Sequence, residues 1–249
     1  MKEKKTVEAW LYSADKRRIV DLVLKMGAMS EEALKNALDS LFTENTYLAQ
    51  SVIQGDDEID AMEREIDYEC LRSIAMRQPV REELRFVFAV LKTITDIERI
   101  GDEAVNIAEW TLDLKKYDKT NMNPVISGMR DIVETMLRDA LTAFRTSDVE
   151  LALDICRRDD HLDRMYADVF DEFIELMASH EAITTKNTAI VRIWAGQMWV
   201  TRHLERVGDH ITNIAERVYF MTTGEALQKK PWDQSAKYKS LFHQPVTDE

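Results

Sequence analysis

Glycine and proline are scarce in this chain of 249 residues, which contains seven glycines and four prolines. Turn-rich β structure depends on these two residues, so their scarcity favours long helices. Hydrophobic residues make up 45% of the chain, and its length is ample for one large or two modest hydrophobic cores. We therefore predict an all-α protein with two domains.

Cysteines and long apolar runs are also rare. Cys70 and Cys156 lie far apart within helical patterns and form no CxxC spacing, which argues against a disulfide framework or a zinc site and predicts buried free thiols. The most apolar stretch, 189–200, is about twelve residues long and contains Arg192 and Gln197. A membrane span needs roughly 20 apolar residues, so we expect no transmembrane segment. The charged N-terminus lacks the apolar centre of a signal peptide.

Positive charge is in short supply, with 33 Lys and Arg residues against 46 Asp and Glu residues and a net charge of −13. Non-specific nucleic-acid binding depends on Lys and Arg displacing counterions from phosphates. The charge balance therefore argues against a nucleic-acid partner. An acidic protein can still bind cations.

Apolar residues recur at three- and four-residue steps along most of the chain, the spacing of amphipathic helices. Asn123-Pro124 is a helix start, with an N-cap followed by a first-turn proline, and Gly224 is a helix end. The predicted helices are 14–54, 56–78, 82–116, 124–158, 159–179 and 185–223, with breaks at Gly55, Pro79 and the polar stretch 117–123.

An internal repeat relates the two halves. The segment 98–109, ERIGDEAVNIAE, returns at 205–216 as ERVGDHITNIAE, identical at eight of twelve positions with an offset of 107. A shorter match pairs 56–62 with 159–165 at an offset of 103. We predict two tandem three-helix bundles, residues 1–119 and 120–224, followed by a tail at 225–249.

Acidic residues four apart lie on one face of each repeated helix. If the second and third helices form a hairpin that turns near residues 79–81, Asp60 lies level with Glu98 and Asp102. In the second copy the midpoint between Asp163 and the pair Glu205/Asp209 falls near 185, where 182–186 independently reads as a turn. The spacing therefore predicts that carboxylates of two helices converge in each bundle.

Converging carboxylates repel one another unless a cation or a proton compensates. Hard di- or trivalent cations prefer oxygen ligands, and helix bundles build such sites from facing helices. Carboxylates alone do not choose among Fe, Zn, Mn, Mg, Ca and Ni. The candidate metal ligands, including one neutral amide oxygen in each copy, are Asp56, Asp60, Glu98, Asp102, Asn106, Asp159, Asp163, Glu205, Asp209 and Asn213.

A simpler interpretation is a solvated acidic face in which Arg99 and Arg206 are ordinary salt-bridge partners. Gly101 and Gly208 favour the metal, because a mid-helix glycine costs about 1 kcal/mol against alanine and suggests the close approach of a neighbour. Tight helix packing would explain these glycines equally well. A di-iron enzyme would need Glu-x-x-His pairs, and none occurs. For His161, His203 and His210 we favour a polar surface position over a role as outer ligands.

The same motifs resemble the PhoU family, over about residues 15–224. The resemblance is carried by the Met26-Gly27 step, by 55–60 (GDDEID), by 77–80 (RQPV) with 84–86 (LRF), and by the doubled motif at 98–109 and 204–216. The doubled Glu-x-x-x-Asp signature is the most specific of these.

The resemblance implies a cytoplasmic, non-catalytic negative regulator of phosphate uptake and phosphate-starvation signalling. Such proteins couple the ATPase of a phosphate ABC transporter to a sensor histidine kinase, with at most peripheral membrane association. Family members bind metal clusters through Glu/Asp-x-x-x-Asp motifs, which here are Asp56, Asp60, Glu98, Asp102 and their counterparts in the second copy, Asp159, Asp163, Glu205 and Asp209. A homodimer is also expected.

Two alternatives remain open. One is a helical-bundle metalloprotein, for metal storage or metal-dependent catalysis, and the other is a paralogue that serves a different transporter. The chain also departs from the family pattern at 81–83, which read Arg-Glu-Glu, and in the tail after Gly224. In addition, position 203 is His where the first copy has Asp96, so the two sites need not bind alike.

Overall fold

The computed structural model describes residues 2–117, 121–178 and 188–227. These residues form six α-helices and no strand, which confirms the predicted all-α class. The helices are α1 (Lys2–Thr43), α2 (Thr46–Arg77), α3 (Glu82–Leu114), α4 (Pro124–Thr146), α5 (Val149–Ala178) and α7 (Thr188–Thr223).

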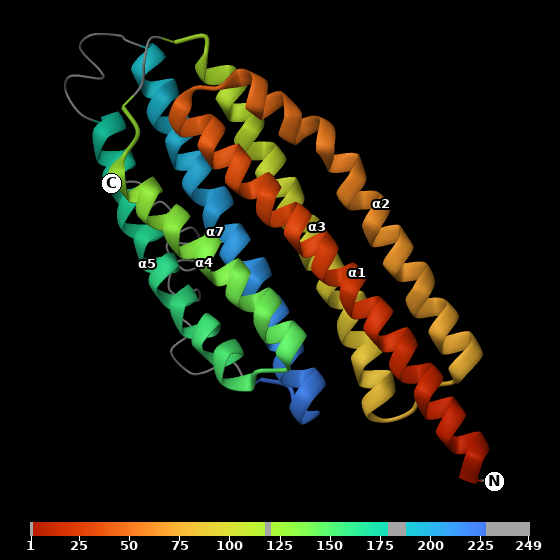
Figure 1. Cartoon of the computed structure of the whole chain (residues 1–249). Coiled ribbons are helices and arrows are strands. Elements are labelled where there is room, and N and C mark those ends of the chain that lie inside the picture. The colour runs from red at the N-terminus through yellow and green to blue at the C-terminus, as the bar shows by residue number, and fades with distance from the viewer. Residues whose placement is uncertain (1, 118–120, 179–187, 228–249) are drawn as a thin grey trace, which may run out of the picture.

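The helices form two three-helix bundles that lie side by side (Figure 1). Helices α1, α2 and α3 pack on one another in the first bundle, and α4, α5 and α7 do so in the second. Helices α3 and α7, which carry the repeated motif, pack against each other and join the two bundles, while α1 and α4 add a second contact.

The first helix break of each repeat differs from its predicted position. Gly55 lies inside α2, and the chain instead breaks at Glu44 and Asn45. Glu44 is left-handed (φ 53°), and the side chain of Asn45 accepts hydrogen bonds from the backbone N–H groups of Tyr47 and Leu48, at 3.1 Å each. A strong N-cap at Asn45 thus starts α2 well before the half-buried Gly55, which the helix tolerates.

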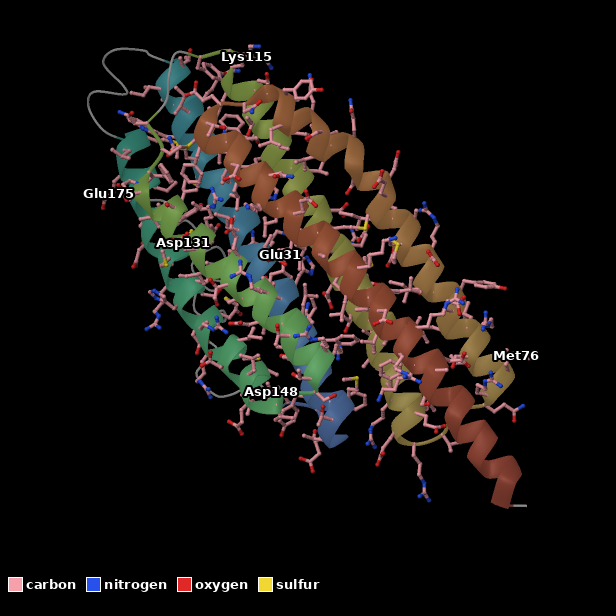
Figure 2. The ribbon with its side chains drawn as sticks, in the orientation of Figure 1. Glu31, Met76, Lys115, Asp131, Asp148 and Glu175 are labelled. Carbon is pink, nitrogen blue, oxygen red and sulfur yellow. The ribbon has the colours of Figure 1, made fainter. Side chains whose placement is uncertain are left out.

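The second bundle repeats this break. Ser147 is left-handed (φ 56°), and Asp148 accepts a 3.0 Å hydrogen bond from the backbone N–H of Leu151 at the start of α5 (Figure 2). The break predicted between 158 and 159 is therefore wrong. Residues 147 and 148 follow 44 and 45 by 103 positions, the same offset that relates the acidic motifs of α2 and α5.

The first helix begins at Lys2 and not at the predicted residue 14, but several other predicted helix ends agree with the structure. Helix α2 ends at Arg77 and α3 begins at Glu82, Asn123 accepts a hydrogen bond from the N–H of Val125 beside Pro124, and Gly224 ends α7 with a φ of 81°. The turn predicted at 182–186 lies outside the described residues, as do residues 118–120 at the predicted domain boundary and the tail from 228 onward.

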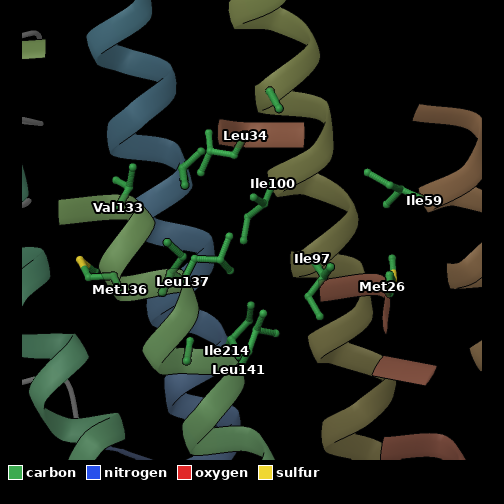
Figure 3. Close-up of a cluster of buried hydrophobic side chains, with 14 of the residues drawn as sticks. Met26, Leu34, Ile59, Ile97, Ile100, Val133, Met136, Leu137, Leu141 and Ile214 are labelled. Atoms are coloured by element: carbon green, nitrogen blue, oxygen red, sulfur yellow. The ribbon is translucent and has the colours of Figure 1, made fainter. Parts of the chain in front are cut away.

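One hydrophobic core continues from the first bundle into the second. Met26 of α1 and Ile97 and Ile100 of α3 belong to the same buried cluster as Leu137 of α4 and Ile214 of α7 (Figure 3). Because burying apolar surface drives folding, this continuity couples the stability of the two repeats.

The two cysteines lie in helices of different bundles, Cys70 in α2 and Cys156 in α5. Cys70 is buried and Cys156 is half-buried, and both are free thiols. Burial, the larger cause, and nearby carboxylates raise the pKa of each thiol to about 12. None of the described helices combines the length and the apolar character that a membrane crossing requires.

Candidate metal centres

The first acidic cluster joins the candidate ligands of α2 and α3. Burial raises the pKa of Glu98 to about 7, and the charges of Asp102 and Asp60 add to the increase. The pKa of Asp56 is also raised, by burial and then by the charges of Asp102 and Asp60. The structure therefore brings these four carboxylates within electrostatic range of one another across the α2–α3 hairpin.

The second acidic cluster repeats the arrangement between α5 and α7. Burial and then the charges of Asp163 and Asp209 raise the pKa of Asp159 to about 8. Burial, followed by the charge of Asp209, raises the pKa of Glu205 to about 7. A carboxyl pKa raised to 7 or 8 indicates that ionising these groups in the folded protein is unfavourable, because buried negative charges are poorly solvated and repel one another.

One carboxylate oxygen of the second cluster is buried and poorly satisfied. The Oδ1 atom of Asp159 forms no hydrogen bond of good geometry with the described residues, although the Thr212 hydroxyl lies close enough to lower the pKa of this carboxyl group. A buried acceptor without a partner costs roughly 1–3 kcal/mol, so native proteins usually satisfy it with an ion or water. This poorly satisfied oxygen, within a set of hard oxygen donors, fits a hard metal cation.

The two mid-helix glycines lie directly against these clusters. A Cβ atom built on Gly101 would lie 3.1 Å from Ile59 Cδ1 and 3.5 Å from Asp56 Oδ1. On Gly208 it would lie 2.9 Å from Asp159 Oδ1, and it would also clash with Leu162. Both glycines therefore admit a packed aliphatic side chain and a candidate metal ligand from the neighbouring helix.

Arginines neutralise part of each cluster. Arg99 lies 3.0 Å from Asp102 and 3.4 Å from Glu98, as the simpler interpretation expected. In the second cluster Arg202 contacts Glu205 at 2.6 Å, and Arg206 reaches a different carboxylate, that of Glu103 on α3. Within the described ranges, no three acidic, histidine or cysteine side chains converge as a ready-made metal site. A bound metal would therefore require some of these side chains to rotate.

The predicted amide ligands meet acidic groups at the contact between the bundles. The Nδ2 atom of Asn106 donates to Glu103 at 3.4 Å, and that of Asn213 donates to Asp96 at 3.0 Å. Each amide thus donates to an acid at the α3–α7 contact. A metal-binding role for the two oxygens stays a prediction.

Two acid–histidine bridges cross this contact, and the sequence interpretation missed them. His203 Nδ1 lies 2.5 Å from Glu103, and His210 Nδ1 lies 3.0 Å from Asp96. His203 is 5% exposed, so the predicted surface position is wrong for this histidine, whereas His210 is half-buried and His161 is exposed as predicted. Burial alone would raise the pKa of Glu103, but hydrogen bonding to His203 and the charges of His203 and Arg206 hold it below its ordinary value.

The repeat explains the pairing of the two bridges. Position 203 aligns with 96 and position 210 aligns with 103 at the offset of 107. The two bridges are therefore exchanged by the symmetry of the repeat, with both acids on α3 and both histidines on α7. The sequence signal for these bridges is that an acid of the first repeat is replaced by histidine in the second at both aligned pairs, 96/203 and 103/210.

The fold and the two clusters define a class of protein, a tandem-repeat helix bundle with an acidic site in each repeat. The PhoU domain matches this chain twice, at residues 23–111 and 126–218. The chain belongs to the PhoU family.

Relatives and solved structures agree with membership of the PhoU family. A PhoU homologue of Clostridium acetobutylicum, described as a phosphate-specific transport system accessory protein, is 32% identical over 86% of this chain and 95% of its own length. A homologue of Deinococcus radiodurans with the same description is 35% identical over 85% and 96%. The crystal structure of PhoU from Pseudomonas aeruginosa matches 86% of this chain and all of its own, with a TM-score of 0.79 and 32% identity.

Proposed function

We propose that this protein is a regulatory accessory protein of phosphate transport that represses the phosphate-starvation response when phosphate is plentiful. The observation that carries the proposal is family membership across both repeats, together with relatives described as accessory proteins of the phosphate-specific transport system. The family role is one of regulation, so we propose no catalytic activity.

The proposal includes metal binding at both acidic clusters. Asp56, Asp60, Glu98 and Asp102 would hold metal in the first bundle, and Asp159, Asp163, Glu205 and Asp209 in the second. The raised carboxyl pKa values and the poorly satisfied Oδ1 of Asp159 support this part of the proposal. A bound di- or trivalent cation would supply the positive charge that these carboxylates lack.

Partner binding forms the second part of the proposal. We propose a cytoplasmic homodimer that contacts the ATPase of a phosphate ABC transporter and a sensor histidine kinase. Large apolar side chains are exposed near the turn between α2 and α3, namely Leu71, Met76, Val80, Leu84 and Phe88. Exposed apolar groups gathered at one end of a bundle are typical of protein contacts.

The test replaces the host gene in a strain that carries a phosphate-starvation reporter. Wild-type protein should restore repression in high phosphate, whereas Glu98→Ala/Asp102→Ala and Glu205→Ala/Asp209→Ala should each lose at least half of it. The control is Asp131→Asn/Glu150→Gln, which removes two exposed acids of α4 and α5 outside the clusters and should repress normally. Failure of the wild type to repress would overturn the regulatory role.

Metal content separates the two parts of the proposal. Elemental analysis of the purified proteins should find metal in the wild type and in the control, and less metal in each double variant. Normal repression with no bound metal would remove the metal from the function and leave the regulator. Co-purification of the ATPase and the kinase tests the partners, and light scattering tests the dimer.

A further inference from the structure

A cleft of about 390 Å³ opens between α5 and α7, outside the acidic clusters. Tyr166 and Phe170 of α5 form one wall, with ring centroids 6.0 Å apart. Trp199 and His203 of α7 form the other wall, with ring centroids 5.4 Å apart. Its volume falls in the lower part of the roughly 300–1,000 Å³ range of small-molecule sites.

Two arginines line the same cleft in a protein whose net charge is −13. The guanidinium of Arg202 lies over the ring of Tyr166, with its Cζ atom 5.8 Å from the centroid. Arg202 and Arg206 contact Glu205 and Glu103 through one nitrogen each, Nη1. A guanidinium carries five N–H donors, so each arginine keeps donors for an anionic ligand, and phosphate groups match this geometry.

Two further features point to a ligand. The Nε2 atom of His203 is buried without a hydrogen-bond partner among the described residues, on a side chain that is 6% exposed and lines the cleft. Trp199, in contrast, is 61% exposed beside it. An aromatic ligand against Trp199 would cover this ring, and a polar group of the ligand would satisfy the histidine once its ring shifts toward the cleft, since its Nε2 atom has almost no accessible surface.

We propose that this cleft binds a nucleoside monophosphate, with its base stacked among Tyr166, Phe170 and Trp199 and its phosphate held by Arg202 and Arg206. Aromatic rings stack on any base, at about 1–3 kcal/mol per base, and paired guanidinium groups bind phosphate strongly. The small volume favours one base and one phosphate over a dinucleotide. The proposal depends neither on bound metal nor on a role in phosphate transport.

Isothermal titration of the full chain with AMP, GMP and UMP tests the proposal, with adenosine, ribose 5-phosphate and inorganic phosphate as partial ligands. At least one nucleotide should bind with a Kd below 1 mM, and every partial ligand should bind at least tenfold more weakly. Trp199→Ala and Arg202→Gln should each weaken binding at least tenfold. Both residues are exposed, so both variants should fold, which circular dichroism checks.

Matched controls come from the first repeat. Arg99→Gln removes an arginine that pairs with an acidic cluster, as Arg202 does, and Tyr47→Ala removes an aromatic ring that is 83% exposed. Both should bind nucleotide like the wild type. Absence of binding at 5 mM of every nucleotide would overturn the proposal, as would inorganic phosphate binding as tightly as AMP. Loss of self-association in Trp199→Ala with unchanged nucleotide affinity would assign the cleft to a second copy and also overturn it.

Discussion

Helices α3 and α7 carry nearly the same motif, yet the two copies have different surroundings. In the first cluster Asp60 and Asp102 are 39% and 34% exposed, and Arg99 contacts two carboxylates. In the second cluster burial raises the pKa of Asp159 to about 8, and its buried Oδ1 forms no hydrogen bond of good geometry with the described residues. The repeat therefore places the carboxylates at equivalent positions, while the surrounding helices set how far burial and repulsion raise the pKa of each one.

The bridges between the repeats show the same inequality. Glu103 is 1% exposed and contacts both His203 and Arg206, whereas Asp96 is 15% exposed and contacts His210 and Asn213. Loss of one partner from a buried ion pair costs about 3–5 kcal/mol, and exposed pairs contribute far less. The two bridges occupy equivalent positions but should contribute unequally to stability.

Glu103→Ala should have the largest effect, a loss of about 3 kcal/mol in the free energy of unfolding. Asp96→Ala should cost about 1 kcal/mol, because its bridge is closer to solvent. Urea denaturation followed by circular dichroism measures both values. Equal losses would contradict the inequality between the bridges.

The pH dependence of the metal-free protein should come next in size. Between pH 4 and pH 8 the unfolded chain ionises Asp159 while the folded protein keeps it protonated, so the unfolded state binds fewer protons and stability falls as pH rises. The stabilisation is fully present below pH 4 and is lost as pH passes 8. Thermal denaturation between pH 5 and pH 9, in the presence of a chelator, follows this decline.

Asp159→Asn should remove part of this decline and stabilise the metal-free protein at pH 8.5 by about 2 kcal/mol, since one pKa unit corresponds to about 1.4 kcal/mol and partial solvation reduces the full value. Asp56→Asn, at the equivalent position of the first cluster, should have a smaller effect, because Arg99 offsets part of the negative charge there. If both substitutions have the same effect, ionising Asp56 destabilises the folded protein as much as ionising Asp159 does, and the two clusters do not differ in this respect.

Metal addition should offset the loss of stability that the metal-free protein shows as pH rises. Saturating Mn²⁺ should raise the melting temperature at pH 8 by about 3–6 °C, because a cation that binds only the folded state stabilises it. The increase should shrink more in Glu205→Gln than in Glu98→Gln. An equal reduction in the two variants would show that both clusters bind the ion alike.

The smallest effect should come from the two equivalent helix breaks. Ser147→Gly and Glu44→Gly place glycine at left-handed positions and should each stabilise the protein by about 0.5–1 kcal/mol. The two gains should be nearly equal, since the backbone conformation is the same in both repeats. Differential scanning calorimetry compares them, and a loss of stability in either variant would refute the shared geometry.

Local rules explain which parts of the fold could be predicted. The hairpin turn at 78–81, the Asn123-Pro124 start and the Gly224 end depend on a few neighbouring residues, and the structure has them where the sequence predicts them. The breaks predicted at Gly55 and between residues 158 and 159 were wrong because a capping residue lies earlier in each long helical pattern. Asn45 and Asp148 satisfy the first N–H groups of their helices, and in the first repeat this outweighs the low helix propensity of Gly55.

Some features of the candidate sites could be predicted from the sequence, and others could not. Carboxylate spacing predicted which acids face one another, because helix period and hairpin length set their level. The histidine bridges and the aromatic cleft were missed, because they require α3 to pack against α7 and α5 to approach one face of α7. Spacing along the chain does not say how the two repeats dock, which decides the bridges, or how the side chains of α5 and α7 pack within the second bundle, which decides the cleft.

The sequence by itself determined the helices, the repeat, the family and the pairing of acidic residues within each bundle, because each depends on contacts close along the chain. Only the tertiary structure decided which carboxylates are buried, which histidines bridge the bundles and where a cleft opens. Burial and docking depend on one core shared by both repeats, and the equivalent residues of a repeated motif do not meet the same neighbours there.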